Sequence, residues 1–284
     1  MPESPEVQAL AEFLDERLSG RTIDDVDVLE FRAVKTRGTP PAALVGAPVT
    51  DVERFGKHLD VTVGERHLVV SLGRHGWARW TPPGGAAESA PDAPPALATF
   101  TSDDASRWQL TDAGTWVSLG LFVVDDPREV PAIAKLGPDP ADPTFSPADL
   151  DAVLVGRRKQ LKAVLQEQDS LAGIGNAYSD EILHEARLSP VVHAASLDEA
   201  ERERLYAAIT ATIRGAIAAR RGVPIEQLKA AKVAAMRVHG RAGETCPVCG
   251  DTVQTLAFGS TTAEYCPTCQ TRGLLLGEAA ARHE

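Results

Sequence analysis

The four cysteines of this 284-residue chain occur as two pairs with the same spacing, Cys246-Pro-Val-Cys249 and Cys266-Pro-Thr-Cys269. Each C-x2-C turn can direct two thiolates at one ion, and four thiolates complete the tetrahedral shell of zinc. The sixteen residues between the pairs are enough for a β-hairpin through about 253–265. Four protein ligands leave no open position for water, so the sequence predicts one structural zinc ion.

A disulfide framework is the alternative interpretation of the cysteines, and it is poor in a reducing cytosol. Glu3, Glu6 and Glu12 stand where an export signal would be apolar. No apolar run approaches the ~20 residues of a membrane span. We therefore expect a cytoplasmic protein with no membrane partner. A ribbon that only stabilises the C-terminal region remains an alternative role for the zinc motif.

The formal charge of −11 argues against a nucleic-acid partner when the chain is taken as a whole. The acidic excess lies in residues 1–150, which carry 24 acidic and 13 basic residues, whereas residues 151–284 carry 16 of each. Binding to a polyanion depends on local patches and not on the sum. A basic run at Arg157, Arg158, Lys159 and Lys162 offers one such patch, although a solvated helix face is the commoner explanation.

The first half of the chain has the pattern of one helix followed by short strands. Apolar residues recur at helical spacing over 5–18, and Gly20 is a plausible C-cap. A Pro/Gly/Ala-rich stretch, 82–96, predicts a loop. This pattern predicts a helix plus an antiparallel β-sandwich or barrel over residues 1–130. The expected strands are 22–31, 58–63, 67–72, 77–81, 97–101, 108–111 and 116–124.

The second half is helical after a linker at 131–147. Ser146, Pro147 and Asp149 form a capping signal. A helical domain over 148–236 and a zinc hairpin with a tail over 237–284 are expected, with helices at 147–155, 158–168, 176–186 and 198–220. The GIGN turn at 173–176 can open a helix toward a phosphate, but simple helix packing is the commoner explanation of glycines there.

Taken in order, these motifs resemble the formamidopyrimidine-DNA glycosylase/endonuclease VIII family of base-excision repair enzymes. The resemblance covers nearly the whole chain. It implies an α+β multidomain fold: an N-terminal helix and β-sandwich, a helix-two-turn-helix domain and a zinc-ribbon hairpin. The motifs that carry it are MPESPEV (1–7), FGKHLDV (55–61), LGRHG (72–76), LAGIGNAYSDEIL (171–183), VHGRAGETCPVCG (238–250) and EYCPTCQ (264–270).

The resemblance implies a catalytic role for the first residues. Removal of Met1 leaves Pro2 with a secondary amine, and an α-amine has a pKa near ~8, so much of it is nucleophilic at neutral pH. Pro2 is then expected to form a Schiff base with C1′ of a damaged nucleotide. Glu3 is expected to move protons, Glu6 to support it, and Lys57, on a strand facing the site, to contact the phosphate and sugar.

The resemblance also implies DNA contacts, with Lys162 and Asn176 expected to bind phosphates. Arg74, followed by His75, replaces the methionine that fills the gap left by the flipped-out base. The stretch 111–120 matches a loop that wedges into the duplex in the family. There Asp112 is kept, Gly114 and Thr115 replace two arginines, and Trp116 replaces a phenylalanine. Thr261 replaces the phosphate-binding arginine of the zinc hairpin. These departures predict an altered lesion specificity, with oxidised pyrimidines, abasic sites or a less usual adduct as candidates beside 8-oxoguanine.

The leading hypothesis is a monomeric bifunctional DNA glycosylase/AP lyase acting on damaged double-stranded DNA. One alternative is a catalytically weak or inactive lesion-binding protein on the same scaffold, which the acidic charge and the missing hairpin arginine favour. Another is a zinc-ribbon scaffold that binds protein and has no salt-dependent affinity for DNA.

Overall fold

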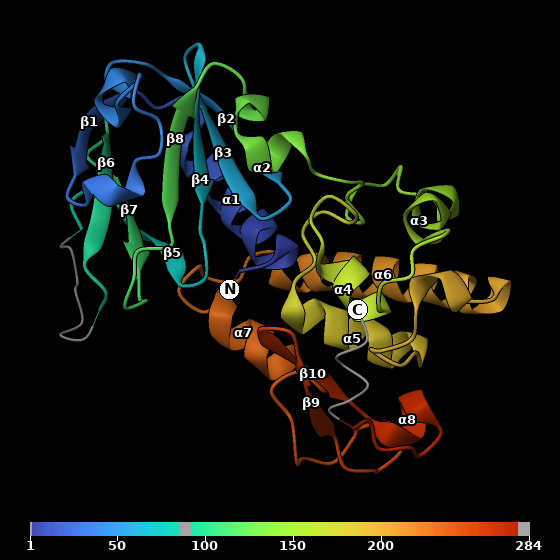
Figure 1. Cartoon of the computed structure of the whole chain (residues 1–284). Coiled ribbons are helices and arrows are strands. Elements are labelled where there is room, and N and C mark those ends of the chain that lie inside the picture. Colours follow the sequence, from blue (N-terminus) through green and yellow to red (C-terminus); the bar gives the residue numbers. More distant parts are fainter. Residues whose placement is uncertain (1, 86–92, 278–284) are drawn as a thin grey trace. The chain divides into compact units, whose positions relative to one another are not determined.

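The computed structural model describes residues 2–85 and 93–277 (Figure 1). The chain forms two compact units, each described separately below. The first comprises residues 1–135 and 220–229, and the second comprises 136–219 and 230–284. A helix that crosses a membrane needs about 20 apolar residues, and no helix in the described part of the chain offers such a stretch.

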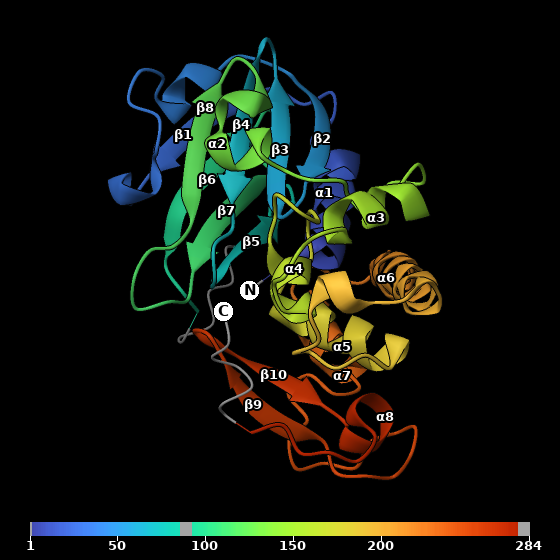
Figure 2. The same ribbon diagram turned by 45° about the vertical axis from the view of Figure 1, so that its right-hand side comes forward.

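The first unit is a β-sandwich with a helix at its start, as expected. Its described residues form two four-stranded antiparallel sheets, in the orders β1-β6-β7-β5 and β2-β3-β4-β8 (Figures 1 and 2). The helix α1 (Ser4–Leu18) packs against β2 and β3. The strands are β1 (Ile23–Val28), β2 (Val49–Phe55), β3 (His58–Val63), β4 (Arg66–Ser71), β5 (Gly76–Thr81), β6 (Ala96–Ser102), β7 (Arg107–Asp112) and β8 (Gly120–Val124).

The apolar face of α1 joins the inner faces of both sheets in one core. Leu10, Leu14 and Leu18 are fully buried there, at the helical spacing that the sequence shows. On the other sheet, Trp108 stacks on Phe100 with ring centroids 4.4 Å apart. Burial of each such side chain contributes about 1.5–3 kcal/mol, so this core fixes the start of α1 against the sandwich.

Two expectations for the strands differ from the structure. The strand β2 was not expected, because the charged residues of VTDVERF hide its alternation. The expected strand 116–124 begins only at Gly120, since residues 113–119 form a loop held by Asp112. In the expected loop 82–96, residues 86–92 lie outside the described residues, and β6 begins at Ala96.

Short helical turns join these strands and follow the sandwich. They are the 3-10 turns Phe31–Ala33, Pro41–Leu44 and Pro127–Glu129, and the helix α2 (Pro131–Ala134). Pro131 occupies the first turn of α2, where its missing N–H is not needed.

The segment 220–229 belongs to the first unit, although the expected helical domain 148–236 includes it. Ile225 and Leu228 are buried in the sandwich core. The indole Nε1 of Trp77 donates a hydrogen bond to the carbonyl of Ile225 at 2.9 Å. These contacts, which join distant parts of the chain, explain why the boundaries of the compact units differ from those that composition indicated.

The second unit contains the helices after the linker, except for residues 220 and 228–229, which belong to the first unit. Ser146 caps α3 as expected, since its hydroxyl accepts the Asp149 N–H at 3.3 Å and the Asp149 carboxylate accepts the Ser146 N–H at 2.8 Å. The helix α5 spans the expected residues. The helices are α3 (Pro147–Leu154), α4 (Leu161–Gln166), α5 (Asn176–Ala186), α6 (Glu199–Arg220) and α7 (Leu228–Ala235); a 3-10 turn, Ala194–Ser196, precedes α6.

A hairpin and a short helix complete the second unit. The strands β9 (Gln254–Phe258) and β10 (Thr261–Tyr265) pair antiparallel, and α8 (Pro267–Thr271) follows. The strand β10 lies against α5 (Figures 1 and 2). Tyr265 and Phe258 are buried on the same face of the hairpin, beside Ala163 of α4 and Val191. The hairpin is thus packed onto the helices and is not an isolated ribbon.

Candidate catalytic, metal and DNA-binding sites

The start of α1 carries three of the expected catalytic residues. Glu3 is the N-cap, and its side chain and that of Glu6 form a reciprocal capping box. The Glu3 N–H donates to Glu6 Oε2 at 3.1 Å. Both residues are almost fully buried, at 2% exposed, and Pro2 immediately precedes them, half-buried. The cap fixes the backbone on which the Pro2 nitrogen lies.

Lys57 lies in the two-residue turn between β2 and β3, not on a strand as expected. Gly56 adopts φ +58°, which a tight turn needs. Arg54 braces the turn, since its Nη1 donates to the Gly56 carbonyl at 2.8 Å and its Nε donates to Gln8 Oε1 at 3.0 Å. Gln8 lies five residues after Glu3, roughly 7.5 Å along α1. Arg54 therefore ties the Lys57 turn to the first turns of α1.

Arg74, His75 and Trp116 lie on two neighbouring loops of the first unit. All three side chains are exposed, and Trp116 is 81% exposed. The Arg74 N–H donates to Ser118 Oγ at 3.0 Å, and the Ala113 N–H donates to the His75 carbonyl at 3.2 Å. Hydrogen bonds thus join the turn 73–75 to the loop 113–119 in one exposed surface, which we call the tip loops.

Asp112, at the end of β7, organises the tip loops. Its Oδ2 accepts the N–H groups of Ser118 and Leu119 at 2.7 and 3.0 Å, and its Oδ1 accepts the Gly114 N–H at 2.9 Å. Burial alone raises the pKa of Asp112, but these hydrogen bonds to the carboxylate outweigh burial and lower it. An ionised carboxylate therefore holds the loop that carries Trp116 through hydrogen bonds.

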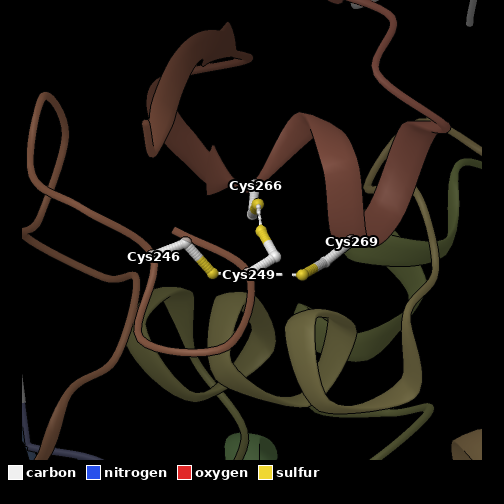
Figure 3. A group of neighbouring side chains, drawn as sticks. All are labelled: Cys246, Cys249, Cys266 and Cys269. Atoms are coloured by element: carbon white, nitrogen blue, oxygen red, sulfur yellow. Dashed lines mark hydrogen bonds between the residues drawn. The ribbon is translucent and has the colours of Figure 1, made fainter. Parts of the chain in front are cut away.

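The four cysteine sulfur atoms gather in the second unit, as the spacing predicts (Figure 3). They all lie within 4.8 Å of one another, with Cys249 and Cys266 at 3.3 Å and Cys246 and Cys269 at 3.9 Å. None is in a disulfide. Four thiolates bound to zinc at about 2.3 Å lie about 3.8 Å apart, so this donor set fits one structural zinc ion.

His184 of α5 adjoins the cysteine cluster and was not expected from the sequence. Its Nε2 lies 3.3 Å from Cys246 Sγ, and the residue is 3% exposed. Burial is the main cause that lowers the pKa of His184, to about 4. The neutral ring can donate its Nε2 proton to a thiolate, which links α5 to the metal ligands.

Lys162 of α4 is fully buried, which differs from the phosphate contact that the resemblance implies. Its ammonium group forms an ion pair with Asp180 Oδ1 at 2.6 Å. It also donates to Ser179 Oγ at 2.9 Å and to the Asn176 carbonyl at 3.3 Å. The ammonium therefore supports the first turn of α5 from inside the protein.

Asn176 begins α5 and is half-buried. Its Oδ1 accepts a hydrogen bond from Gln166 Nε2 at 3.1 Å. The preceding GIGN turn is braced by Gln168, whose Nε2 donates to the Ile174 carbonyl at 2.8 Å and whose Oε1 accepts the Gly173 N–H at 3.0 Å. The N-terminus of α5 thus has a fixed conformation, and its helix dipole favours an anion.

Asp180 and Glu181 connect α5 to the zinc hairpin, and sequence reasoning did not single them out. The second oxygen of Asp180 accepts from His239 Nδ1 at 2.8 Å, and its Oδ1 accepts the Glu264 N–H at 3.2 Å. Glu181 accepts the N–H groups of Arg237, Val238 and His239 at 2.9–3.0 Å. The available signal was two adjacent acidic residues directly before the apolar pair Ile182-Leu183.

Thr261 lies at the turn of the zinc hairpin, at the first position of β10, and is half-buried. Its hydroxyl donates to the Phe258 carbonyl at 3.1 Å. Pro2, Glu3, Glu6, Lys57, Arg74, His75 and Trp116 belong to the first unit, and Lys162, Asn176, Thr261 and the cysteines belong to the second.

Three family models match successive parts of the chain. The formamidopyrimidine-DNA glycosylase N-terminal domain matches residues 1–117, the H2TH domain of the same enzyme matches 136–226, and a zinc finger found in FPG and IleRS matches 243–272. A formamidopyrimidine-DNA glycosylase from Symbiobacterium thermophilum is 34% identical over 292 residues, which cover 99% of this chain and 94% of that protein.

Solved structures are similar over the same extent. The MutM (Fpg) protein of Thermus thermophilus is 30% identical, with a TM-score of 0.79 over 95% of this chain and 98% of that one. The Lactococcus lactis Fpg, solved in complex with DNA that contains an abasic site, has a TM-score of 0.82 at 23% identity. That match covers 95% of this chain and 99% of that one, and it shows the shared fold.

Proposed function

Because this chain belongs to the formamidopyrimidine-DNA glycosylase family, we propose that it excises a damaged base from double-stranded DNA through the Pro2 amine and then cuts the strand. The observation that carries the proposal is the start of α1. There Pro2 immediately precedes two buried carboxylates that fix the helix cap.

In the proposed reaction, the lone pair of the Pro2 nitrogen attacks C1′ as the bond from C1′ to the base breaks. The base leaves with a proton, and opening of the sugar ring gives an iminium on Pro2. The iminium acidifies the C2′ proton. Glu3, next to Pro2, moves protons at the sugar. Loss of the C2′ proton expels the phosphate from C3′, and water then hydrolyses the iminium to an aldehyde, which returns the free Pro2 amine.

The proposed DNA contacts come from surfaces in both units. Lys57, on its braced turn, contacts the phosphate and sugar beside the lesion. The N-terminal end of α5, with Asn176, contacts a phosphate, which the helix dipole favours at that end. Lys162 holds that helix end from within and does not reach the DNA. The zinc ion, when bound to the four cysteines, supplies no chemistry to the reaction and holds the hairpin.

We further propose that the tip loops give the enzyme a lesion preference different from 8-oxoguanine. Extruding a base costs a few kcal/mol, which inserted side chains partly offset. The exposed Trp116 stands where the family has a phenylalanine, and the exposed Arg74, followed by His75, stands where it has a methionine. A changed wedge alters which base pair is opened. Cleavage rates on a panel of duplexes, each with one oxidised purine, oxidised pyrimidine or abasic site, test this preference.

Borohydride trapping on a duplex with one abasic site tests the chemistry, because borohydride reduces an iminium to a permanent cross-link. Intact mass first establishes that Met1 is absent. We expect a cross-link with the native chain, its loss in Pro2→Gly, and its retention in Pro5→Ala, which changes another proline of the same helix start. Binding without a cross-link, by protein that lacks Met1, would refute catalysis and favour a lesion-binding protein.

A further inference from the structure

A buried arginine from a distant part of the chain reaches the start of α1. Arg220 ends α6 and opens the segment that packs with the first unit. Its side chain is 4% exposed, and its Nε lies 3.8 Å from Oε1 of Glu6, whose side chain is 3% exposed. The guanidinium and the carboxylate thus form an ion pair that is almost fully removed from water.

Glu6 connects Arg220 to the proposed nucleophile. Oε1 of Glu6 faces Arg220, while Oε2 accepts the Glu3 N–H at 3.1 Å. The Glu3 side chain in turn completes the capping box at the Glu6 N–H. Pro2 is bonded directly to Glu3. A displacement of the Glu6 carboxylate is therefore transmitted to the backbone that carries the Pro2 nitrogen.

The ion pair with Glu6 does not satisfy the hydrogen-bond donors of Arg220. At 3.8 Å the contact with Glu6 is too long for a hydrogen bond. Within the described residues, the Nε and Nη2 of Arg220 are buried and have no hydrogen-bond acceptor. Buried donors without acceptors are costly, and each one in a native protein calls for an explanation. Hydrogen bonds used in catalysis are often long without substrate and shorten when it binds.

We propose that Arg220 is a positioning residue for Pro2. Its charge holds the buried Glu6 carboxylate in place as the acceptor for Glu3. When the damaged nucleotide is bound, the Arg220 Nε–H closes onto Glu6 and fixes the first turn of α1. This proposal rests on the proposed function, because it concerns the alignment of the Pro2 amine with C1′.

Single-turnover trapping rates and duplex affinities of four variants test the proposal. The variants are Arg220→Gln, Arg220→Lys, Glu6→Gln and the double variant Arg220→Gln/Glu6→Gln. The matched control is Arg221→Gln, which removes the same charge from the next residue, where Arg221 pairs with Glu12 at 3.2 Å on the surface. The abasic duplex and the borohydride reaction are those described for Pro2.

We expect Arg220→Gln to slow iminium formation by about 10- to 100-fold, the scale of an error of about 1 Å in positioning. The duplex Kd should stay within about twofold of the native value, since Arg220 does not touch DNA in this proposal. Arg220→Lys should recover part of the rate, and Arg221→Gln should match the native protein. The rate of iminium formation in the double variant should fall no further than in either single variant, because both changes break the same contact between Arg220 and Glu6.

The outcomes separate this proposal from the proposed function. A native chain that forms no cross-link refutes the function, and the positioning role with it. A native chain that reacts while Arg220→Gln reacts equally fast refutes the positioning role alone. A rate loss matched by an equal loss of duplex affinity, or additive losses in the double variant, also refutes it. If Arg220→Gln does not fold, the trapping rates and duplex affinities of Arg220→Lys and Glu6→Gln are compared with those of the native protein instead.

Discussion

Replacement of Lys162 by methionine distinguishes a structural role from a phosphate contact. The change removes an ammonium group that pairs with Asp180 at 2.6 Å, with both side chains 0% exposed. It leaves a buried carboxylate that keeps the His239 and Glu264 donors but has lost its cation. Breaking a buried pair from one side costs about 3–5 kcal/mol. We expect Lys162→Met to lower the free energy of unfolding by this amount.

Urea unfolding followed by circular dichroism measures the loss. The matched control is Lys159→Met, which breaks an exposed pair with Glu167 at 2.7 Å in a side chain that is 64% exposed. An exposed pair contributes about 0–1 kcal/mol, so this variant should unfold close to the native protein. Lys162→Met/Asp180→Asn should be less destabilised than the sum of its single changes, because the pair is then removed together.

The salt dependence of DNA binding gives the result that would refute a structural role for Lys162. A lysine that contacts a DNA phosphate contributes about 0.9 to the slope of log Kobs against log salt. Lys162→Met would then unfold like the native protein and bind duplex DNA with a slope reduced by about one. That combination would restore the phosphate contact that the resemblance implies.

Other features give predictions of the same kind. Removal of zinc by a chelator should cause the hairpin to lose its fixed structure, since zinc binding is coupled to folding in such sites. Near-ultraviolet circular dichroism measures the loss of structure, and thiol titration measures the exposure of the four cysteines. His184→Phe should weaken zinc binding about 10- to 100-fold, measured by competition with a chromophoric chelator. Asp112→Asn should destabilise the tip loops by about 1.5–3 kcal/mol and weaken duplex binding in fluorescence anisotropy. The folded-state pKa of Asp112 is lowered from 3.8. The ionised carboxylate therefore stabilises the folded protein above pH 3.8, and this stabilisation is lost as the pH falls through the folded-state pKa. In acid denaturation, the difference in unfolding free energy between the native and Asp112→Asn proteins should disappear. Trp116→Ala should leave the unfolding free energy unchanged, since the ring is exposed, and slow excision from duplexes that contain a paired lesion.

Local signals predicted much of the secondary structure. The capping box at Ser146 and the glycine turn before Asn176 set two helix starts from within a few residues, and both were confirmed. The cysteine pairs likewise predicted the zinc site, because each turn is defined by four consecutive residues. The family resemblance, which the comparisons confirm, supplied the order of the domains.

Contacts between residues that are distant in the sequence could not be predicted from it. The strand β2 was missed because its charged residues conceal the pattern, and α7 and α8 were not expected either. Lys162 looked like part of a basic surface patch, and only Asp180, packed beside it on another helix, explains its burial. Glu6 and Arg220 are 214 positions apart, and no periodicity links them.

The return of residues 220–229 to the first unit makes the two units interleaved in sequence. The chain leaves the sandwich at residue 135, builds most of the helical unit, re-enters the sandwich, and leaves again at 229. A fragment that ends at residue 135 would lack Ile225 and Leu228 and would expose the apolar surface that they cover. Cleavage by a protease within residues 138–146, part of the expected linker 131–147, should therefore give two pieces that stay together without a covalent bond. Neither unit of this protein is a module that gene fusion could transfer by cutting the chain once.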